Sequence, residues 1–590
     1  MKNFTPTLVF LFSLCIFNLS KAQENFGYNI QQNNHNDPLD YLEDNYNTES
    51  DLPPNLNEEN FSRFSSIEYT FDGSWSPANP IGLATSLDDI KILSGKASIS
   101  ANTICNNLVV EAGASLTISA GVTLTTTVVD LYSSSTTYSN LISDGTIIGV
   151  VNYHRYTAQI GTNDLISSPL DGQLFETFAL TNSDNLASSS FIRAFAPYVT
   201  STGSYQNYSV ITNLLTPIES GIGYRAATTD GSALTFTGQV RTTDVLDIPI
   251  SDATAGGAWN LIGNPYASYL DFATFFELNK SELENTSFMA VYGYDGNASD
   301  GWTVWNQATI DSPAVTELIA PGQAFFVKAK TGGGLIDFTT DMRTIGSSDD
   351  FILGRPQQSP HYGYIKLDIE ADDSNFETDI YFNSNASKGF DTGYDAALYG
   401  QTPPSFSIYT ELVENNTGVP FAIQALNPES MDDVVIPLGL NVSQGHEVTI
   451  SKIAGDLPED INVYIEDTAN NTFTLINTSD YVFTATEDLS GVGRFYVRFE
   501  KNLLGTVDTH LNELNIYSDN SNKTIVVAGQ LQNNAATKLY DVNGRMVMST
   551  SLNSNMLSQV IDVSHLTTGI YIIEIDNEIN GNYTQKLIIK

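Results

Sequence analysis

The sequence predicts an all-β protein made of several modules. Its 590 residues are enough for several domains, since one domain takes roughly 100–200 residues. From Trp75 onward, short runs rich in β-branched and aliphatic residues show apolar residues at alternate positions, which is typical of strands. Gly, Asn and Ser separate these runs at short spacing, and no helical stripe of apolar residues appears. A hydrophobic content of 41% is sufficient for packed cores and excludes wholesale disorder.

The charge balance excludes one class of partner. The chain has 25 Lys and Arg residues against 68 Asp and Glu residues, a formal net charge of -43. Nucleic acids and acidic lipid surfaces would meet net repulsion, so we expect no nucleic-acid partner.

The N-terminus predicts export. Residues 1–22 combine a basic start, a short apolar run at 8–17 and the small residues Ser20 and Ala22, which together are typical of a secretory signal peptide. This predicts passage through the general secretory translocon. The apolar run is too short for a permanent transmembrane helix, and no later stretch reaches that length. Residues 23–60 hold nine acidic residues and no Lys or Arg, which predicts an acidic disordered leader.

Residues 61–150 predict a short β-solenoid-like segment. Brief apolar runs such as 90–93, 108–110 and 115–118 recur between turn residues. Rungs of a solenoid bury their inward residues by stacking on their neighbours, which suits runs of this length. A sheet of an ordinary sandwich is the alternative.

The next segment contains an internal duplication with a period of roughly one domain length. It predicts two β-rich units, at 151–250 and 251–350, each with one short helix, around 174–178 and around 270–276. The matching pairs are Leu165–Pro169 with Leu261–Pro265, Phe191–Phe195 with Phe288–Tyr292, Ile218–Tyr224 with Ile319–Phe325, and Leu234–Thr237 with Ile336–Thr339.

Two further β modules complete the chain. Residues 351–500 alternate with period two, as in Ile461–Ile465 and Arg494–Phe499, which predicts a β-sandwich. Residues 508–590 predict a compact last module with a hairpin at 538–547, because Asn543-Gly544 supplies the positive φ angles of a tight turn.

The last module resembles the type A C-terminal sorting domain of the type IX secretion system of Bacteroidetes-type bacteria. The resemblance implies a seven-stranded immunoglobulin-like sandwich that is read by the type IX translocon. It also implies removal by a sortase-like protease near 505–512, and a final location in the medium or on the outer cell surface. The residues that carry the sorting signal in this comparison are Lys538, Tyr540, Asp541, Gly544, Arg545, Gly569, Tyr571, Lys586 and Lys590.

One loop in the second repeat offers ligands for a cation. Asp295, Asn297, Ser299 and Asp300 place oxygen atoms at nearly alternate positions, as in a calcium loop, although the distal Glu is missing. Calcium is therefore the one cofactor that the sequence suggests, and an ordinary Asp/Asn/Gly turn is the alternative.

Aromatic residues flank this loop. Exposed rings on a rigid β scaffold can stack on the apolar faces of sugars, which would make this region a glycan-binding site. Burial of the same rings in a β core is the competing interpretation. The candidates are Tyr292, Tyr294, Trp302 and Trp305.

Catalysis has little support in the sequence. The acidic doublets 349–350, 372–373 and 432–433 could supply the two carboxylates of a glycosidase. Adjacent residues on a strand, however, point to opposite faces. We expect a secreted or cell-surface, non-enzymatic protein that acts in adhesion or glycan binding. A polysaccharide-acting hydrolase with paired carboxylates and a ligand-free structural stalk are the alternatives.

Overall fold

The computed structural model describes the chain from residue 66 onward, with gaps. The described ranges are 66–294, 302–312, 318–347, 361–372, 374–501, 514–519, 522–529, 531, 534–554, 556, 558–577 and 581–590. The predicted signal peptide (1–22), the predicted acidic leader (23–60) and the predicted cleavage region (505–512) all lie outside these ranges.

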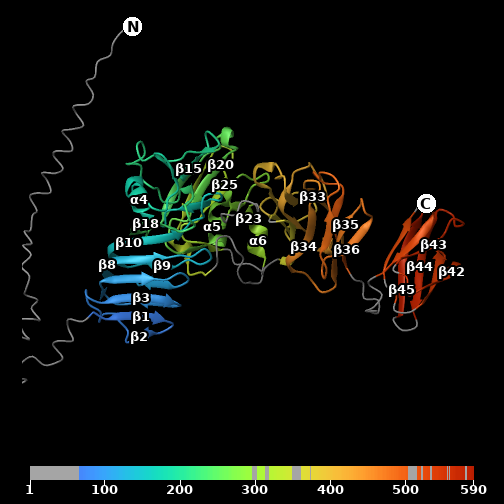
Figure 1. The fold of residues 1–590 in the computed structure, drawn as a ribbon, viewed down its shortest axis with the longest axis horizontal. Coiled ribbons are helices and arrows are strands. Elements are labelled where there is room, and N and C mark those ends of the chain that lie inside the picture. Colours follow the sequence, from blue (N-terminus) through green and yellow to red (C-terminus); the bar gives the residue numbers. More distant parts are fainter. Residues whose placement is uncertain are drawn as a thin grey trace, which may run out of the picture. The chain divides into compact units, whose positions relative to one another are not determined.

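Parallel strands stack into a solenoid in the first module (Figure 1). Its main sheet pairs neighbouring rungs in register, so that Ile90, Leu108, Val129 and Val151 form one ladder of side chains that are at most 1% exposed. The strands are β3 (Asp89–Ser94), β6 (Asn107–Val110), β8 (Thr123–Tyr132) and β10 (Thr146–Tyr156), with β1 (Glu68–Asp72) and β2 (Trp75–Ser76) beyond β3. The solenoid-like segment predicted from the sequence is confirmed.

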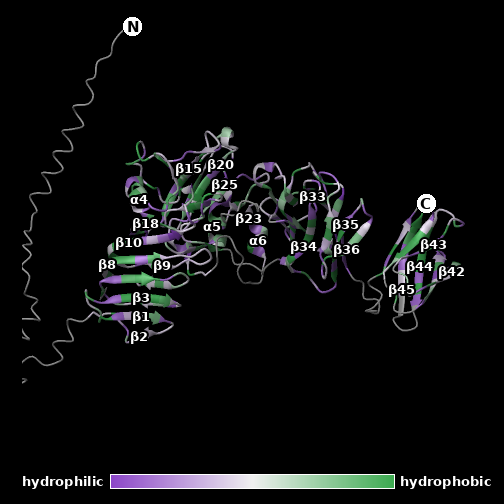
Figure 2. Ribbon diagram, viewed as in Figure 1, coloured by the Kyte–Doolittle hydropathy of each residue, from purple (hydrophilic) through white to green (hydrophobic). Residues whose placement is uncertain are grey.

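A second parallel sheet forms another wall of the solenoid. It contains β4 (Lys96–Ile99), β7 (Ser115–Ile118) and β9 (Asn140–Ser143). Hydrophobic and hydrophilic residues alternate along the solenoid strands in Figure 2, because one face of each strand points to the shared core. Cys105 lies in this core, 2% exposed, and burial raises the pKa of its thiol.

The duplicated sequence is a duplicated structure. Each repeat contains a four-stranded antiparallel sheet, and the two sheets share one strand order. The first is β11 (Asp164–Ser167), β17 (Gly223–Ala226), β15 (Phe195–Val199), β16 (Ser204–Tyr205), and the second is β20 (Trp259–Gly263), β25 (Ala324–Lys328), β22 (Val291–Gly293), β23 (Thr303–Trp305). A helix follows the first strand in each, α4 (Phe175–Thr181) and α5 (Phe272–Asn279).

Sheet register corrects one of the four sequence matches by one residue. Ala196 lies opposite Arg225, and Tyr292 lies opposite Phe326. Since Arg225 and Phe326 are themselves opposite the equivalent residues Leu165 and Leu261, Tyr292 corresponds to Ala196 and not to Phe195. The shift matters because neighbouring strand residues point to opposite faces.

The two repeats contact each other reciprocally. Ile166 of the first bridges to Gln323 of the second, and the equivalent Ile262 of the second bridges to Ile222 of the first. Small residues allow the close approach, because a Cβ on Gly223 would lie 2.7 Å from the Cβ of Ala324, its counterpart. The repeats therefore pack as a pseudo-symmetric pair.

Each repeat also carries a strand that covers its helix. In the first this is β18 (Ala233–Val240), which pairs with β10 and so joins the solenoid sheet, and in the second it is β26 (Gly334–Phe338), which pairs with β19 (Val245–Ile250).

The module that follows is one eleven-stranded sheet that curls nearly into a barrel, in place of the two-sheet sandwich predicted for residues 351–500. Its far ends meet where Asp467, at the end of β35, accepts a hydrogen bond across 2.7 Å from the hydroxyl of Tyr481, at the start of β37. Arg494 also donates to Asp467 across 2.7 Å. The longest strands are β28 (His361–Ala371), β29 (Ser374–Asn383), β33 (Asp433–Asn441), β34 (Glu447–Asp456), β35 (Ile461–Asp467) and β38 (Phe495–Lys501). The shorter ones are β30 (Ala396–Ala397), β31 (Ser407–Thr410), β32 (Phe421–Leu426), β36 (Thr472–Leu475) and β37 (Tyr481–Thr484).

Two sheets form the C-terminal module, as the resemblance implied. One contains β39 (Asn515–Asp519), β40 (Thr524–Ala528) and β43 (Ser558–Asp562), and the other contains β42 (Met546–Leu552), β41 (Ala535–Asp541), β44 (Gly569–Asn577) and β45 (Gly581–Ile589). The β41–β42 turn differs from the predicted type, because Gly544 has a φ of 76° while Asn543 does not adopt a positive φ. The amide of Gly544 instead donates to the Asp541 carbonyl across 2.9 Å, closing a turn that ends on one left-handed glycine.

Candidate binding site

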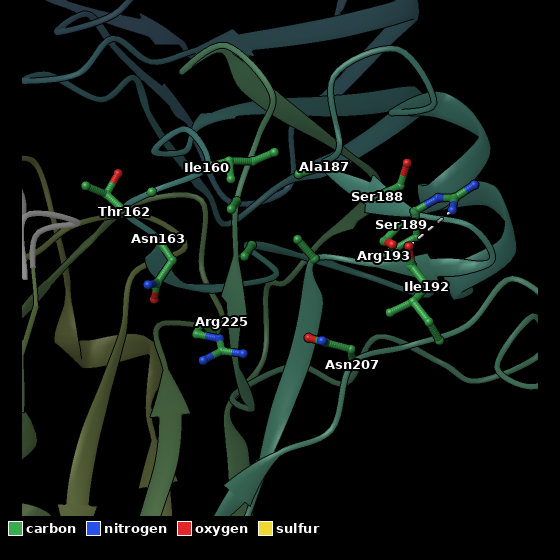
Figure 3. A pocket seen from close by; sticks show the side chains of 14 residues that line it. Ile160, Thr162, Asn163, Ala187, Ser188, Ser189, Ile192, Arg193, Asn207 and Arg225 are labelled. Carbon is green, nitrogen blue, oxygen red and sulfur yellow. Dashed lines mark hydrogen bonds between the residues drawn. The ribbon is translucent and has the colours of Figure 1, made fainter.

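A cavity of about 320 Å³ opens on the first repeat (Figure 3). Four segments line it: the loop before β11, the hairpin of β13 (Ser188–Ser189) and β14 (Ile192–Arg193), the segment after β16, and the strand β17. In Figure 3 the side chains of Asn163, Arg225 and Asn207 face the same space, and Arg193 lies on the hairpin side. The cavity thus gathers the guanidinium of Arg225 and two carboxamides, while the guanidinium of Arg193 folds back over the hairpin at its edge.

Arg225 is fixed by its strand and by an aromatic ring. It lies on β17 between Leu165 of β11 and Ala196 of β15. Its guanidinium carbon lies 4.1 Å from the ring centroid of Tyr205, within cation–π distance. Burial raises the pKa of Tyr205, although the nearby Arg225 opposes this, so the phenol stays neutral at physiological pH. The planar guanidinium therefore has a supporting surface on one side.

Arg193 is held by its own hairpin. Its Nη1 donates to the carbonyl of Ser190 across 3.1 Å. Ser190 has a φ of 57° at the tip of the hairpin. The carbonyl contact uses few of the donors of the guanidinium, which has five N–H groups.

The two pocket arginines differ in their partners from five other arginines of the described ranges. Five arginines pair with carboxylates: Arg241 with Asp171, Arg343 with Asp144, Arg494 with Asp467, Arg498 with Glu466 and Arg545 with Asp541. Within the described ranges, neither Arg193 nor Arg225 has a carboxylate within ion-pair distance. Guanidinium groups without a carboxylate partner are the groups that proteins use to bind carboxylates and phosphates.

Most of the aromatic residues predicted to bind glycans belong to a core. Tyr292, Tyr294 and Trp305 are 0%, 7% and 1% exposed, and the hydroxyl of Tyr292 donates to the Ala397 carbonyl across 2.8 Å. Trp302 is half-buried and stacks on Tyr399 with ring centroids 4.3 Å apart. Burial removes the faces of the first three rings from solvent, which corrects the exposed-ring interpretation for them.

The predicted calcium ligands cannot be placed. Asp295, Asn297, Ser299 and Asp300 lie outside the described residues. In the part of the chain that the structure describes, no group of three or more His, Cys, Asp and Glu side chains could hold a metal ion.

The acidic doublets are only partly described. Both members of 349–350, and residue 373, fall outside the described ranges. The carboxylate of Asp372 accepts a hydrogen bond from His446 Nδ1 across 2.7 Å. Asp432 pairs with Lys501 at 3.4 Å, while its neighbour Asp433 is exposed.

A different carboxylate pair emerges from the register of β28 and β29. Asp368 lies directly opposite Glu377, and the next pair on the same face of the sheet is Lys366 and Asp379. Burial, followed by the charge of Glu377, raises the pKa of Asp368 to about 7. Lys366 contacts Glu377 at 2.6 Å. Sequence reasoning missed this pair because its members lie on different strands.

The sorting-signal residues divide into surface and core groups. Tyr571 is buried, and its hydroxyl donates to the Thr567 carbonyl across 2.8 Å, so it holds the fold of the module. Tyr540 and Lys586 lie on either side of Ile572 on the outer face of the four-stranded sheet. Lys538 is half-buried on that face; Asp541, Gly544 and Arg545 form the β41–β42 turn; and Gly569 and Lys590 lie near the ends of β44 and β45.

One sequence signal could have led to the pocket. The third matched pair of the duplication stops at Tyr224 and Phe325, and the next residues are Arg225 and Phe326. A cation in place of a phenylalanine, on a strand that is otherwise apolar, indicates that the two copies use this position differently.

Comparison with protein families assigns most of the chain. Residues 66–499 match the family described as "Domain of unknown function (DUF8693)". The chain belongs to this family. The DUF8693 region comprises the solenoid, both repeats and the curled sheet, so the pocket is part of it. Residues 515–590 match the family described as "Secretion system C-terminal sorting domain", which confirms the resemblance found in the sequence.

The sorting domain establishes the route of this DUF8693 protein. It is exported by the type IX secretion system to the cell surface or the extracellular space. Among the described residues, no helix is long and apolar enough to cross a membrane.

Other comparisons add little. No curated protein matches the chain. Among solved structures, "Biofilm associated protein - BSP domain" aligns over 74% of this chain and 97% of that chain at 8% identity, with a TM-score of 0.14. "Crystal structure of Dpr11 IG1 bound to DIP-gamma IG+IG2" aligns over 27% and 90% at 6% identity, with a TM-score of 0.07. Scores this low support no inference about fold or function.

Proposed function

We propose that this DUF8693 protein is a non-enzymatic binding protein of the cell surface or the surrounding medium, and that it attaches to a glycan through the pocket of its first repeat. The observation that carries the proposal is the pair of arginines without carboxylate partners, Arg193 and Arg225, in a cavity of about 320 Å³. A cavity of this size with a few convergent polar groups is typical of a site for a small ligand or for one residue of a polymer.

The rest of the molecule supports a binding role. The pocket lies on a rigid sheet whose strands are paired on both sides of Arg225, which limits the rearrangement needed on binding. The sorting domain delivers the chain to a location where surface polysaccharides are available.

The experiment uses the full chain without residues 1–22, applied to a panel of immobilised polysaccharides with and without calcium. Retention and release of reducing sugar are measured together. We expect retention on at least one polysaccharide without sugar release. Release would contradict the non-enzymatic role, and the absence of any retention would favour a ligand-free structural stalk.

A polysaccharide-acting hydrolase is the second candidate, and the pair of Asp368 and Glu377 favours it. A carboxyl group whose pKa is raised to about 7 could act as a general acid beside a second carboxyl group. Against this, Lys366 lies 2.6 Å from Glu377, so the pair has a local partner that stabilises the fold. If sugar is released, Glu377→Gln should abolish the release, whereas Glu447→Gln, on the exposed start of β34, should leave it unchanged.

A further inference from the structure

The two repeats present equivalent faces to their surroundings. In the first repeat, Leu165, Arg225 and Ala196 lie side by side across β11, β17 and β15. In the second, Leu261, Phe326 and Tyr292 occupy the same positions across β20, β25 and β22. Residues directly opposite each other on paired strands share one face of a sheet. The faces can therefore be compared position by position.

The face of the second repeat is occupied by another part of the same chain. The ring of Tyr399 lies 4.5 Å from that of Trp259 and 5.5 Å from that of Phe326, measured between centroids. The segment beside Tyr399 is bound through its backbone, since the carbonyl of Ala397 accepts from Tyr292 and its amide donates to the Ser287 carbonyl. This face thus serves as a docking site within the chain.

The corresponding face of the first repeat borders the pocket at one end, while Leu165 and Ala196 on the same face are buried. By register, Asn163 takes the place of Trp259, and Arg225 takes the place of Phe326. Both are pocket-lining residues. Two positions that contact Tyr399 in the second repeat, those of Trp259 and Phe326, therefore line a cavity in the first.

The substitutions change the chemistry of that position from aromatic to cationic and polar. The guanidinium of Arg225 can donate two parallel hydrogen bonds to a planar carboxylate. Asn163, Asn207 and Ser188 offer donors and acceptors suited to hydroxyl groups, and Ile160 and Ile192 offer apolar contacts at the rim. A ring that carries hydroxyls, C–H faces and one carboxylate matches all of these groups.

We infer that the pocket of the first repeat binds the carboxylate-bearing ring of an acidic saccharide, seated where Tyr399 is seated in the second repeat. This inference rests on the proposed function and names the ligand class of the same site. The carboxylate pairs with Arg225, Arg193 adds positive charge on the hairpin side, and the carboxamides take the hydroxyls. Two sources share this chemistry, uronic acids of polysaccharides and sialic acids of glycoconjugates.

The test is calorimetric titration of the full chain without residues 1–22 by galacturonate, glucuronate, N-acetylneuraminate and neutral galactose. We expect binding of at least one acidic sugar and at least about tenfold weaker binding by Arg225→Gln, since one charged hydrogen bond typically supplies that much. Arg498→Gln is the matched control, because Arg498 pairs with Glu466 on a different module. Binding by uronates alone or by N-acetylneuraminate alone identifies the source, and either supports the inference.

Three outcomes overturn the inference. These are equal affinity for galactose and galacturonate, unchanged affinity in Arg225→Gln, and no binding of any acidic sugar. If such a result accompanies retention on a neutral polysaccharide in the panel experiment, the proposed binding function stands while the ligand class is wrong. A circular dichroism spectrum and melting temperature of Arg225→Gln that match the parent show that loss of binding is not loss of fold.

Discussion

Asn279 and Asp337 form the same pair of hydrogen bonds as Asn182 and Thr235. Each asparagine ends the helix of its repeat and bonds both backbone groups of one residue on the covering strand, at distances of 2.7 to 2.9 Å. Each also donates to the carbonyl of a helical phenylalanine four residues earlier, at 2.9 Å. Both side chains are 2% exposed. The repeat thus uses one buried carboxamide to join its helix to its strand.

Replacing Asn279 by Ala should therefore loosen β26 selectively. The change removes the side-chain partner of the amide and of the carbonyl of Asp337, at a cost of about 1–3 kcal/mol for each buried group left unpaired. We expect amide hydrogen exchange in Leu335–Phe338 to accelerate by at least about tenfold. Asn285→Ala, an exposed asparagine in the same repeat, is the control and should leave exchange unchanged. Equal exchange in both variants would show that the asparagine contributes nothing to the junction.

Gly223 should not tolerate a side chain, because the two repeats approach each other there. A Cβ at this position would lie 2.5 Å from Leu261 Cγ and 2.7 Å from Ala324 Cβ. Overpacking of this kind typically costs about 1–3 kcal/mol, so Gly223→Ala should lower the melting temperature. Gly389→Ala is the matched control, since its Cβ would meet nothing closer than 3.7 Å. Equal melting temperatures of Gly223→Ala and Gly389→Ala would contradict the close packing of the repeats.

Asp368 should make the curled sheet less stable as the pH rises. Its pKa is raised from 3.8 to about 7, by burial and then by Glu377, so the folded chain binds this proton more tightly than the unfolded chain. Stability is therefore lost as pH increases from about 4 to about 7. Asp368→Asn removes this loss and should stabilise the fold by up to ~4 kcal/mol at pH 8, since the pKa of Asp368 lies about three units above its ordinary value and each unit corresponds to about 1.4 kcal/mol.

The measurement compares melting temperatures of Asp368→Asn and the parent protein at pH 8 and at pH 4. We expect a clear increase for the variant at pH 8 and little difference at pH 4. Glu447→Gln on the same sheet, at an exposed position, controls for the general loss of negative charge. An equal difference at both pH values would show that Asp368 titrates normally.

Removal of residues 508–590 should prevent export across the outer membrane. The sorting domain begins within this segment and carries the signal that the type IX machinery reads. In a bacterium with that machinery, we expect the truncated chain to accumulate in the periplasm, as fractionation against a periplasmic marker would reveal. Normal surface delivery of the truncated chain would refute the assignment of this route.

Local patterns account for the parts of the fold that the sequence predicted. The ladder of Ile90, Leu108, Val129 and Val151 follows from alternation within single strands, which is visible along the chain. The duplicated units were recognisable because several strand motifs recur in the same order. The curling of the eleven-stranded sheet was not predictable, because it depends on contacts of Asp467 with Arg494 and Tyr481, which lie in other segments of the chain.

The candidate site could be predicted much less well. Aromatic residues near 292–305 carry no sign in the sequence that Tyr399 and Ala397 cover them. The pocket depends on Arg193 and Arg225, which come from a hairpin and a central strand and meet only through the folding of the repeat. Comparison of the two copies by sheet register reveals the site, because two positions that contact Tyr399 in the second copy line a cavity in the first.

The most direct test of the account is a crystal structure of the chain, without residues 1–22, in complex with the acidic sugar that binds it most tightly in the titrations. The account predicts a carboxylate within hydrogen-bond distance of the Arg225 guanidinium, in the position that superposition of the repeats assigns to the ring of Tyr399. Sugar bound elsewhere, with the pocket of the first repeat empty, would contradict it.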